Sequence, residues 1–291
     1  MTTAPADQMR ALREGCGVLA PPRAFVAVDG PDAEALLQNL LTQDLTGMAD
    51  GEARRALLLT PKARIIADTR AVRLGDGRYL LDLEPEAAAG LAALLLRYRL
   101  AAKADVGVAD QWSLLSLIGP GAPAIELPGT RVATTLGDVP RVDVIVPTIG
   151  LVGSLSAAER AGATPVEEAA VEALRVAAGE VRLGRDVDER WMPAEVGLVD
   201  DAVSFAKGCF IGQEPVTRLH RRGHANRGPR RIASAEPLAA GATLSADGRD
   251  VGVVTSAAGP PWLDAPRAIG IVRIDAEEPL TADGVPVELL P

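Results

Sequence analysis

The chain has 291 residues, of which 48% are hydrophobic and 24% are charged, a balance typical of globular rather than disordered proteins. Its formal net charge of −9 at pH 7 argues against direct nucleic-acid binding by the surface as a whole, because phosphate neutralisation requires a broad basic footprint. The two cysteines, Cys16 and Cys209, lie far apart and do not indicate a disulfide framework, so we expect reduced thiols.

The N-terminal stretch MTTAPADQMR lacks the basic and then apolar pattern of a signal peptide. The apolar run AAAGLAALLLRYRL is too short to span a bilayer and ends in arginines. We therefore expect a soluble, cytoplasmic protein that does not bind a membrane, with a mobile N-terminus before Cys16.

The first hundred residues predict two helices and four strands. The stretch AFVAVDGPDAEALLQNLLTQDL (24–45) predicts a strand and then a helix, with Asp29 or Gly30 as the cap and Pro31 in the first turn. Residues 53–83 predict a meander of three strands, with turns at Pro61-Lys62 and at Gly75-Asp76-Gly77. Residues 84–100 predict a helix with acids at its start and arginines at its end, as the helix dipole favours.

A similar order of elements follows in the next third of the chain. SLLSLIGPGAPAIE (113–126) resembles AFVAVDGPDAEALL, since each has a short apolar strand, a Gly-Pro pair and a helix start, which predicts two related α+β halves. Residues 141–147 predict a strand. Residues 164–179 predict a helix with Thr164 as its N-cap, Pro165 at its first position and Gly179 at its end.

The last part of the chain predicts a small all-β module. After Arg231, short runs rich in valine and isoleucine alternate with glycine and proline turns, as in a small barrel. We place the boundary near Gly228-Pro229. The expected domains are therefore 1–228, with a second subdomain at roughly 50–100, and a barrel at 229–291.

The stretch SFAKGCFIGQEPVTRLHRRGHANR (204–227) is the richest in chemistry. A lysine two residues before Cys209, the arginines after it and a helix beginning near Phe210 would all stabilise the thiolate, which is the reactive form of the thiol. Gly208 and Gly212 leave backbone amides unshielded for a ligand or anion. The alternative is that Cys209 is a small buried residue beside a glycine turn.

The other polar residues of this stretch allow two interpretations each. Gln213 and Glu214 could hydrogen-bond a heteroaromatic ligand, or they could be ordinary helix-surface residues. His220 and His224 have the spacing of helical metal ligands, but a glycine interrupts that helix, so we predict no metal site. The basic run 217–231 is either a solvated face or an electrostatic funnel for a small anion, and it lacks the interleaved aromatics that base stacking requires.

The motif KGCFIGQE (207–214) resembles the signature of the YgfZ proteins, a folate-binding group within the glycine-cleavage T-protein superfamily. The likeness extends over about 17–231, through VDGPDAEALLQNLLTQDL, LLLTPKARIIADTRAV, LRVAAGEVRLGRDVDERWMPAEVGL and RGHANR, and more loosely over the β tail. It implies an α+β fold in three parts: two α/β subdomains around a central channel that admits tetrahydrofolate, and a small C-terminal β-barrel.

The resemblance also implies a function and a set of site residues. The expected function is that of an accessory factor in iron–sulfur cluster assembly or repair, and thereby in tRNA thiolation, with cluster carriers or target proteins as partners. Cys209 would be the essential residue. The side chains expected to tune this thiol or to contact folate are Asp68, Lys207, Gln213, Glu214 and Arg218.

Two departures from the T-protein pattern bear on the reaction. T-proteins that transfer methylene units carry adjacent aspartates in the hairpin, where this chain has Ala67-Asp68, and a glutamate where this chain has Ala177. An accessory factor is therefore favoured over an aminomethyltransferase or a folate-dependent demethylase, which remain the alternative. A third reading is a non-catalytic module that docks an anion, RNA or a protein through the basic run.

Overall fold

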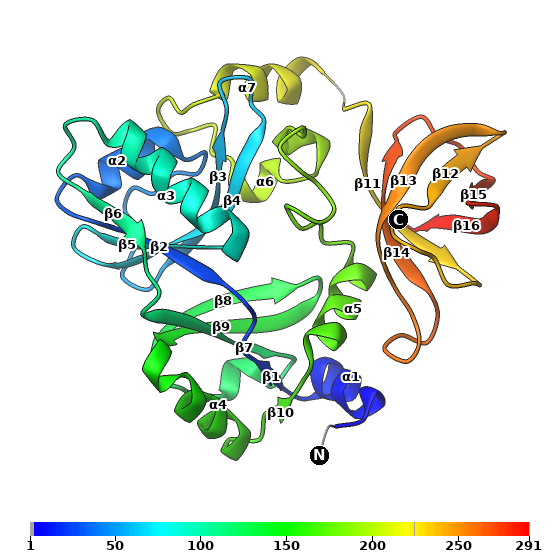
Figure 1. Cartoon of the computed structure of the whole chain (residues 1–291), viewed down its shortest axis with the longest axis horizontal. Helices are drawn as coiled ribbons and strands as arrows, with labels where there is room; N and C mark the ends of the chain where they lie inside the picture. The colour runs from blue at the N-terminus through cyan, green and yellow to red at the C-terminus, as the bar shows by residue number, and fades with distance from the viewer. Residues whose placement is uncertain (1–2, 224, 291) are drawn as a thin grey trace.

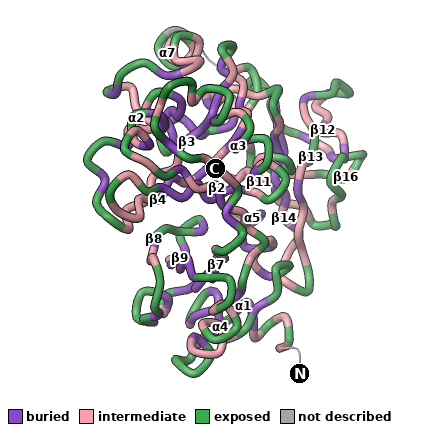
Figure 2. Tube along the Cα trace, turned by 60° about the vertical axis from the view of Figure 1, so that its left-hand side comes forward, coloured by how far each residue is buried: buried purple, intermediate pink, exposed green. Residues whose placement is uncertain are grey.

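The computed structural model describes residues 3–223 and 225–290 and consists of three parts. Two mixed α/β parts and a β-barrel lie at the corners of a triangle (Figure 1). Some clusters of buried residues lie inside one part and others lie between two parts, and the outer loops and helix faces are exposed (Figure 2). The predicted α+β architecture with a C-terminal barrel is confirmed.

The first α/β part is built on an antiparallel sheet of strand order β3-β4-β5-β2-β6. Its strands are β2 Ala24–Asp29, β3 Ala53–Leu59, β4 Ile65–Gly75, β5 Arg78–Leu83 and β6 Asp105–Val108. Helices α2 Ala33–Leu40 and α3 Pro85–Arg99 pack their apolar faces onto this sheet. The meander follows the sequence prediction because its turns are local: Gly77, at φ 64°, adopts the left-handed conformation that the second turn requires.

The second α/β part is built on the sheet β10-β1-β7-β9-β8. Its strands are β1 Gly17–Leu19, β7 Trp112–Ile118, β8 Thr130–Leu136, β9 Val139–Pro147 and β10 Thr164–Pro165. Its helices are α1 Pro5–Glu14, α4 Leu151–Arg160 and α5 Glu168–Ala178. The two sheets lie close to each other where β2 contacts β7.

The C-terminal part is a closed barrel of strand order β11-β14-β13-β12-β15-β16. The strands are β11 Arg227–Ser234, β12 Thr243–Ala246, β13 Arg249–Ala258, β14 Arg267–Arg273, β15 Leu280–Ala282 and β16 Val285–Leu290. Closure leaves no free sheet edge and surrounds a small core that includes Ile232, Leu244 and Val254. Helix α5 packs against β13 and β14, which joins the barrel to the second α/β part.

Two short helices carry the chain from α5 to the barrel. They are α6 Val199–Ala202 and α7 Gln213–Arg222, and α7 lies above the β3–β4 hairpin in Figure 1. The predicted start of α7 near Phe210 is three residues early, because Gly212 adopts a left-handed conformation and ends the preceding loop.

Several sequence expectations were wrong in detail. The N-terminus, expected to be mobile, forms helix α1, and its Leu12 is fully buried. The element after Ile118 is only a 3₁₀ turn, η1 Ala122–Ala124, instead of a second helix. Thr164 and Pro165 do not start a helix; they form β10, which pairs in parallel with β1. Helix α2 begins at Ala33 after Asp32, later than the expected cap at Asp29 or Gly30.

Candidate functional site

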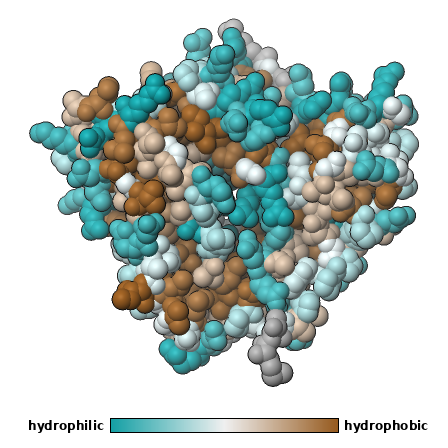
Figure 3. Space-filling model, viewed as in Figure 1, coloured by the Kyte–Doolittle hydropathy of each residue, from teal (hydrophilic) through white to brown (hydrophobic). Residues whose placement is uncertain are grey.

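A cavity of about 560 Å³ lies at the junction of the two α/β parts and the segment that follows α5. Its wall combines apolar side chains such as Leu136 and Val181 with an unusual density of charges. In the orientation of Figure 1, hydrophilic side chains extend over the middle of the molecule, between regions of hydrophobic surface (Figure 3). A volume of this size, with convergent polar groups, is typical of small-molecule sites.

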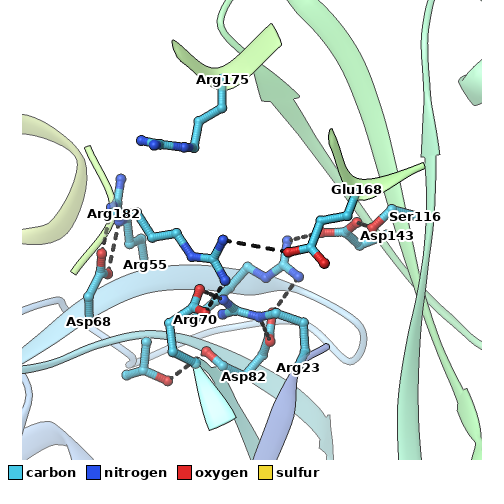
Figure 4. Close-up of polar contacts among 12 residues, drawn as sticks. Arg23, Arg55, Asp68, Arg70, Asp82, Ser116, Asp143, Glu168, Arg175 and Arg182 are labelled. Atoms are coloured by element: carbon cyan, nitrogen blue, oxygen red, sulfur yellow. Dashed lines mark hydrogen bonds and ion pairs between the residues drawn. The ribbon is translucent and has the colours of Figure 1, made fainter. Parts of the chain in front are cut away.

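Arg70 is the centre of the charged wall. Its guanidinium donates to Asp82 at 2.6 Å and to Asp143 at 2.7 Å, and so connects β5 of the first sheet with β9 of the second. Both carboxylates are at most 2% exposed. Nε of Arg70 is buried and has no hydrogen-bond partner among the described residues. Figure 4 shows Arg70 between these acids, beside Arg23.

Asp143 is held in its charged form by several donors. It accepts hydrogen bonds from Ser116 at 2.5 Å and from Arg141 at 2.8 Å, in addition to Arg70. Burial by itself would raise the pKa of Asp143, but the charges of Arg141 and Arg70 and the Ser116 hydroxyl outweigh it and lower the pKa to about 2. This carboxylate is therefore ionised at every physiological pH.

Further arginines extend the network around the cavity. Arg23 binds Asp82 at 2.7 Å and also Glu84, and Arg182 binds Glu84 at 2.6 Å. Arg175 binds Asp186 at 2.7 Å, and both contact Ser256 of the barrel strand β13. Ion pairs thus connect the two α/β parts around the cavity, and hydrogen bonds of Ser256 join the barrel to the same network.

Asp68 lies in the cavity wall, on β4. Its two carboxylate oxygens accept hydrogen bonds from Nε and Nη2 of Arg55, at 3.0 and 2.6 Å. This bidentate pair is a strong and directional arrangement, so Asp68 has little capacity left for a ligand. Its position in the channel is the predicted one, and a ligand-binding role remains a prediction.

The motif loop 203–212 lies outside the cavity wall. Cys209 is exposed, whereas Phe210 next to it is buried. The loop is fixed on the first α/β part, since the Ser204 amide donates to the carbonyl of Thr42 at 3.0 Å. At Gly212, with φ 82°, an added Cβ would lie 2.6 Å from the carbonyl oxygen of Thr60, so this position requires glycine.

Lys207 has a structural role that differs from the expected one. Its side chain is buried, and Nζ donates to the backbone carbonyls of Gln38, Leu41 and Gln43 at 2.6, 2.6 and 3.0 Å. These carbonyls lie in and just after the last turn of α2, where carbonyls have no partner within the helix. The three ammonium protons are therefore committed to α2, and they are not available to the thiol of Cys209 or to folate.

The remaining predicted site residues lie on α7. Gln213 is half-buried, Glu214 and Arg218 are exposed, and none of the three belongs to the wall of the central cavity. His220 stacks on Phe205 with a centroid distance of 4.5 Å, and His224 lies outside the described residues. The described part of the chain contains no cluster of side chains that could hold a metal ion.

The sequence reasoning missed the arginine and carboxylate network, although a local signal exists. Asp82 and Asp143 are charges within otherwise apolar strands, YLLDL and RVDVIVP, at positions whose neighbours are buried. An isolated charge in such a run is buried only when it is paired. The partner could not be identified, because Arg70 is 73 residues before Asp143.

The two cysteines differ sharply in environment. Cys16 is 6% exposed, and its thiol donates to the carbonyl of Gly17 at 3.6 Å. Burial raises the pKa of the Cys16 thiol to about 11. At pH 8 we therefore expect iodoacetamide to modify Cys209 and to leave Cys16 unmodified in the native protein, as measured by peptide mass spectrometry. Modification of both thiols at equal rates would contradict this assignment, and unfolding in urea provides the control in which both react.

Comparison with known proteins agrees with the architecture. The family model of the GCVT N-terminal domain matches residues 1–139, and that of the CAF17 C-terminal beta-barrel domain matches residues 221–291. An aminomethyltransferase of Rubrobacter xylanophilus is 30% identical over 282 residues, covering 87% of this chain and 74% of that protein. The crystal structure of the glycine cleavage system aminomethyltransferase T from Bartonella henselae superposes with a TM-score of 0.84 at 23% identity, over 98% of this chain and 88% of that one.

A second kind of relative is a mitochondrial iron-sulfur cluster assembly factor, an IBA57 homolog of Mycosarcoma maydis. It is 27% identical over 228 residues, or 70% of this chain, and the chain spans about half of that protein (53%). The chain therefore belongs to the glycine-cleavage T-protein (aminomethyltransferase-like) superfamily, as a YgfZ-type member with a CAF17-type C-terminal barrel. Among the described residues, no helix combines the length and the apolar character needed to cross a bilayer.

Proposed function

We propose that this protein is an accessory factor in iron–sulfur cluster assembly that acts through the thiol of Cys209. The observation that carries the proposal is the exposed position of this thiol on a loop fixed by Lys207 and Gly212. Thiolates are the usual ligands of iron–sulfur clusters. The CAF17-type barrel and the similarity to a cluster assembly factor support this role.

The surface near Cys209 suits an acidic protein partner. Five basic side chains of this surface form no ion pair with another described residue: Lys62, Arg218, Arg221, Arg227 and Arg230. They lie on the β3–β4 turn, on α7 and at the start of β11, which η3 Pro193–Glu195 brings together. We propose that cluster carriers or target proteins dock here, because complementary charge increases the rate of encounter.

We further propose that the central cavity holds a reduced folate. The residues that line the cavity suit the pterin head. The carboxylates of Glu168 and Asp201 can accept hydrogen bonds from its amino and ring N–H groups, and Leu136 and Val181 provide an apolar wall. The buried Nε of Arg70 has an unmet hydrogen bond that an acceptor atom of the ligand could satisfy. When bound, a folate supplies a carrier for one-carbon units, and these residues would bind and orient it.

A complementation assay tests the role of Cys209. In a bacterial strain that lacks its own factor of this type, we expect the Cys209→Ala protein to fail to restore the activity of an iron–sulfur enzyme. The matched control is Cys16→Ala, which removes the buried thiol and should restore activity. Full restoration by Cys209→Ala, at equal protein level and with an unchanged circular dichroism spectrum, would show that the thiol has no essential role.

The second candidate is an aminomethyltransferase, which the Rubrobacter relative favours. Two features of the site oppose it. Ala67 replaces the first hairpin aspartate and is buried, and the remaining Asp68 is bound by Arg55 at both oxygens. Turnover of an aminomethyl-lipoyl carrier protein with tetrahydrofolate would decide in its favour.

A further inference from the structure

The walls of the cavity carry more acidic than basic side chains, which affects the charge of the ligand that it can bind. A second cavity of about 730 Å³ adjoins the central one and shares Asp68, Glu84, Glu168 and Arg182 with it. The arginines that line the two cavities are Arg23, Arg55, Arg70, Arg141, Arg175, Arg182 and Arg185. Each of them has a carboxylate within 3.2 Å, so none offers an unpaired positive charge to a ligand.

The carboxylates exceed the arginines. Five carboxylates in the cavity walls have no arginine partner closer than 3.9 Å: Glu86, Glu168, Glu180, Glu189 and Asp201. Glu86 and Glu189 are exposed and line the second cavity. The excess of acidic side chains therefore extends from the central cavity into the adjoining one. The unpaired basic side chains near α7 belong to the wall of neither cavity.

Folates carry different numbers of charges, because each added γ-glutamyl residue brings one more carboxylate to the tail. The pterin head is rich in N–H donors and neutral, so acceptor groups suit it. An extended anionic tail would meet like charges and no unpaired arginine in either cavity. Repulsion between like charges a few ångströms apart lowers affinity and is weakened by salt.

We propose that the cavity binds a monoglutamyl or tail-less reduced pterin in preference to polyglutamyl folates. This inference rests on the proposed folate site. Its specificity residues are Glu86 and Glu189, which would act on the tail by charge and not on the pterin head.

Calorimetry with three probes tests the proposal: 5-formyltetrahydrofolate, its triglutamate and tetrahydropterin, each at 20 mM and 300 mM NaCl. We expect the triglutamate to bind on the order of tenfold more weakly than the monoglutamate at low salt, with a smaller difference at high salt. The double variant Glu86→Gln/Glu189→Gln should reduce the difference. The matched control is Glu236→Gln/Glu277→Gln, which removes two exposed charges from the barrel and should leave the difference unchanged.

Equal or tighter binding of the triglutamate would overturn the proposal, and so would a difference that the Glu86/Glu189 variant leaves intact. Absence of binding for all three probes would overturn it together with the folate site. That result would leave the role of Cys209 standing, because the complementation assay measures that role independently.

Discussion

Replacing Arg70 with methionine is expected to lower the free energy of unfolding by about 3 kcal/mol, because two buried carboxylates then lose their shared cation. Asp82 and Asp143 are at most 2% exposed, so water compensates for little of the lost cation. Arg23 and Arg141 remain as second partners, which keeps the effect at the lower end of what breaking a buried pair costs. Urea unfolding followed by circular dichroism measures the change.

The free energy of unfolding should also depend on pH through Asp143. The pKa of Asp143 is about 2 in the folded protein, below its ordinary value of 3.8, so the unfolded state binds the proton more tightly. Its contribution to stability is therefore present above pH 4 and is lost as the pH falls toward 2. Without the cation of Arg70 the folded-state pKa rises toward the unfolded value, so the acid-dependent loss of stability should be smaller in the variant than in the wild type.

The control is Arg10→Met, which breaks an exposed pair with Asp7. Exposed pairs contribute less than about 1 kcal/mol, so this variant should unfold close to the wild type. If Arg70→Met and Arg10→Met cost the same, the buried network does not hold the two sheets together.

Replacing Lys207 with methionine is expected to cost about 2–4 kcal/mol and to loosen the loop that carries Cys209. The ammonium satisfies three carbonyls at the C-terminal end of α2, and methionine leaves them without this donor. Hydrogen exchange over residues 203–212 should increase in the variant, and the free energy of unfolding should fall. Lys103→Met, at an exposed lysine, provides the control.

Lys207 also has a pH signature of its own. Burial lowers its pKa to about 8 from 10.5, against the opposing charge of Asp44. Between pH 8 and 10.5 the unfolded state binds more protons at this group, so its contribution to stability rises with pH, and this rise should be absent from Lys207→Met. An unchanged loop and an unchanged pH dependence in the variant would contradict the anchoring role.

The elements that could be predicted from the sequence are those fixed by neighbours along the chain. The meander over 53–83 and helix α3 follow from alternation, turn residues and helix-end charges. The prediction of a helix start at Thr164 and Pro165 was wrong because these residues pair with Gly17 and Val18 in a sheet. No local sequence pattern reveals this pairing. Helix α1 was missed for a related reason, since its stability comes from packing against α5 and β1.

The residues of the candidate site also differ in how far local sequence predicts their surroundings. Asp68 lines the cavity, but its predicted role there came from the family resemblance and not from any local pattern, and it stays a prediction. Lys207 was assigned to the thiol because it is two residues from Cys209, yet one side chain is buried and the other exposed. Closeness in sequence does not determine the direction in which a side chain points. The three carbonyls that bind Lys207 are more than 160 residues away in the sequence.

The β3–β4 hairpin touches both functional regions of the molecule. Its strands carry Arg55 and Asp68 in the cavity wall, and its turn at Thr60 and Ala63 packs against Gly212 in the cysteine loop. A small molecule in the cavity and a cluster at the thiol would therefore occupy separate compartments and exchange no atoms. Occupancy of the first could reach the second as a shift of this hairpin or of α6, whose Asp201 also lines the cavity, and the ligand would then be an allosteric effector rather than a reactant.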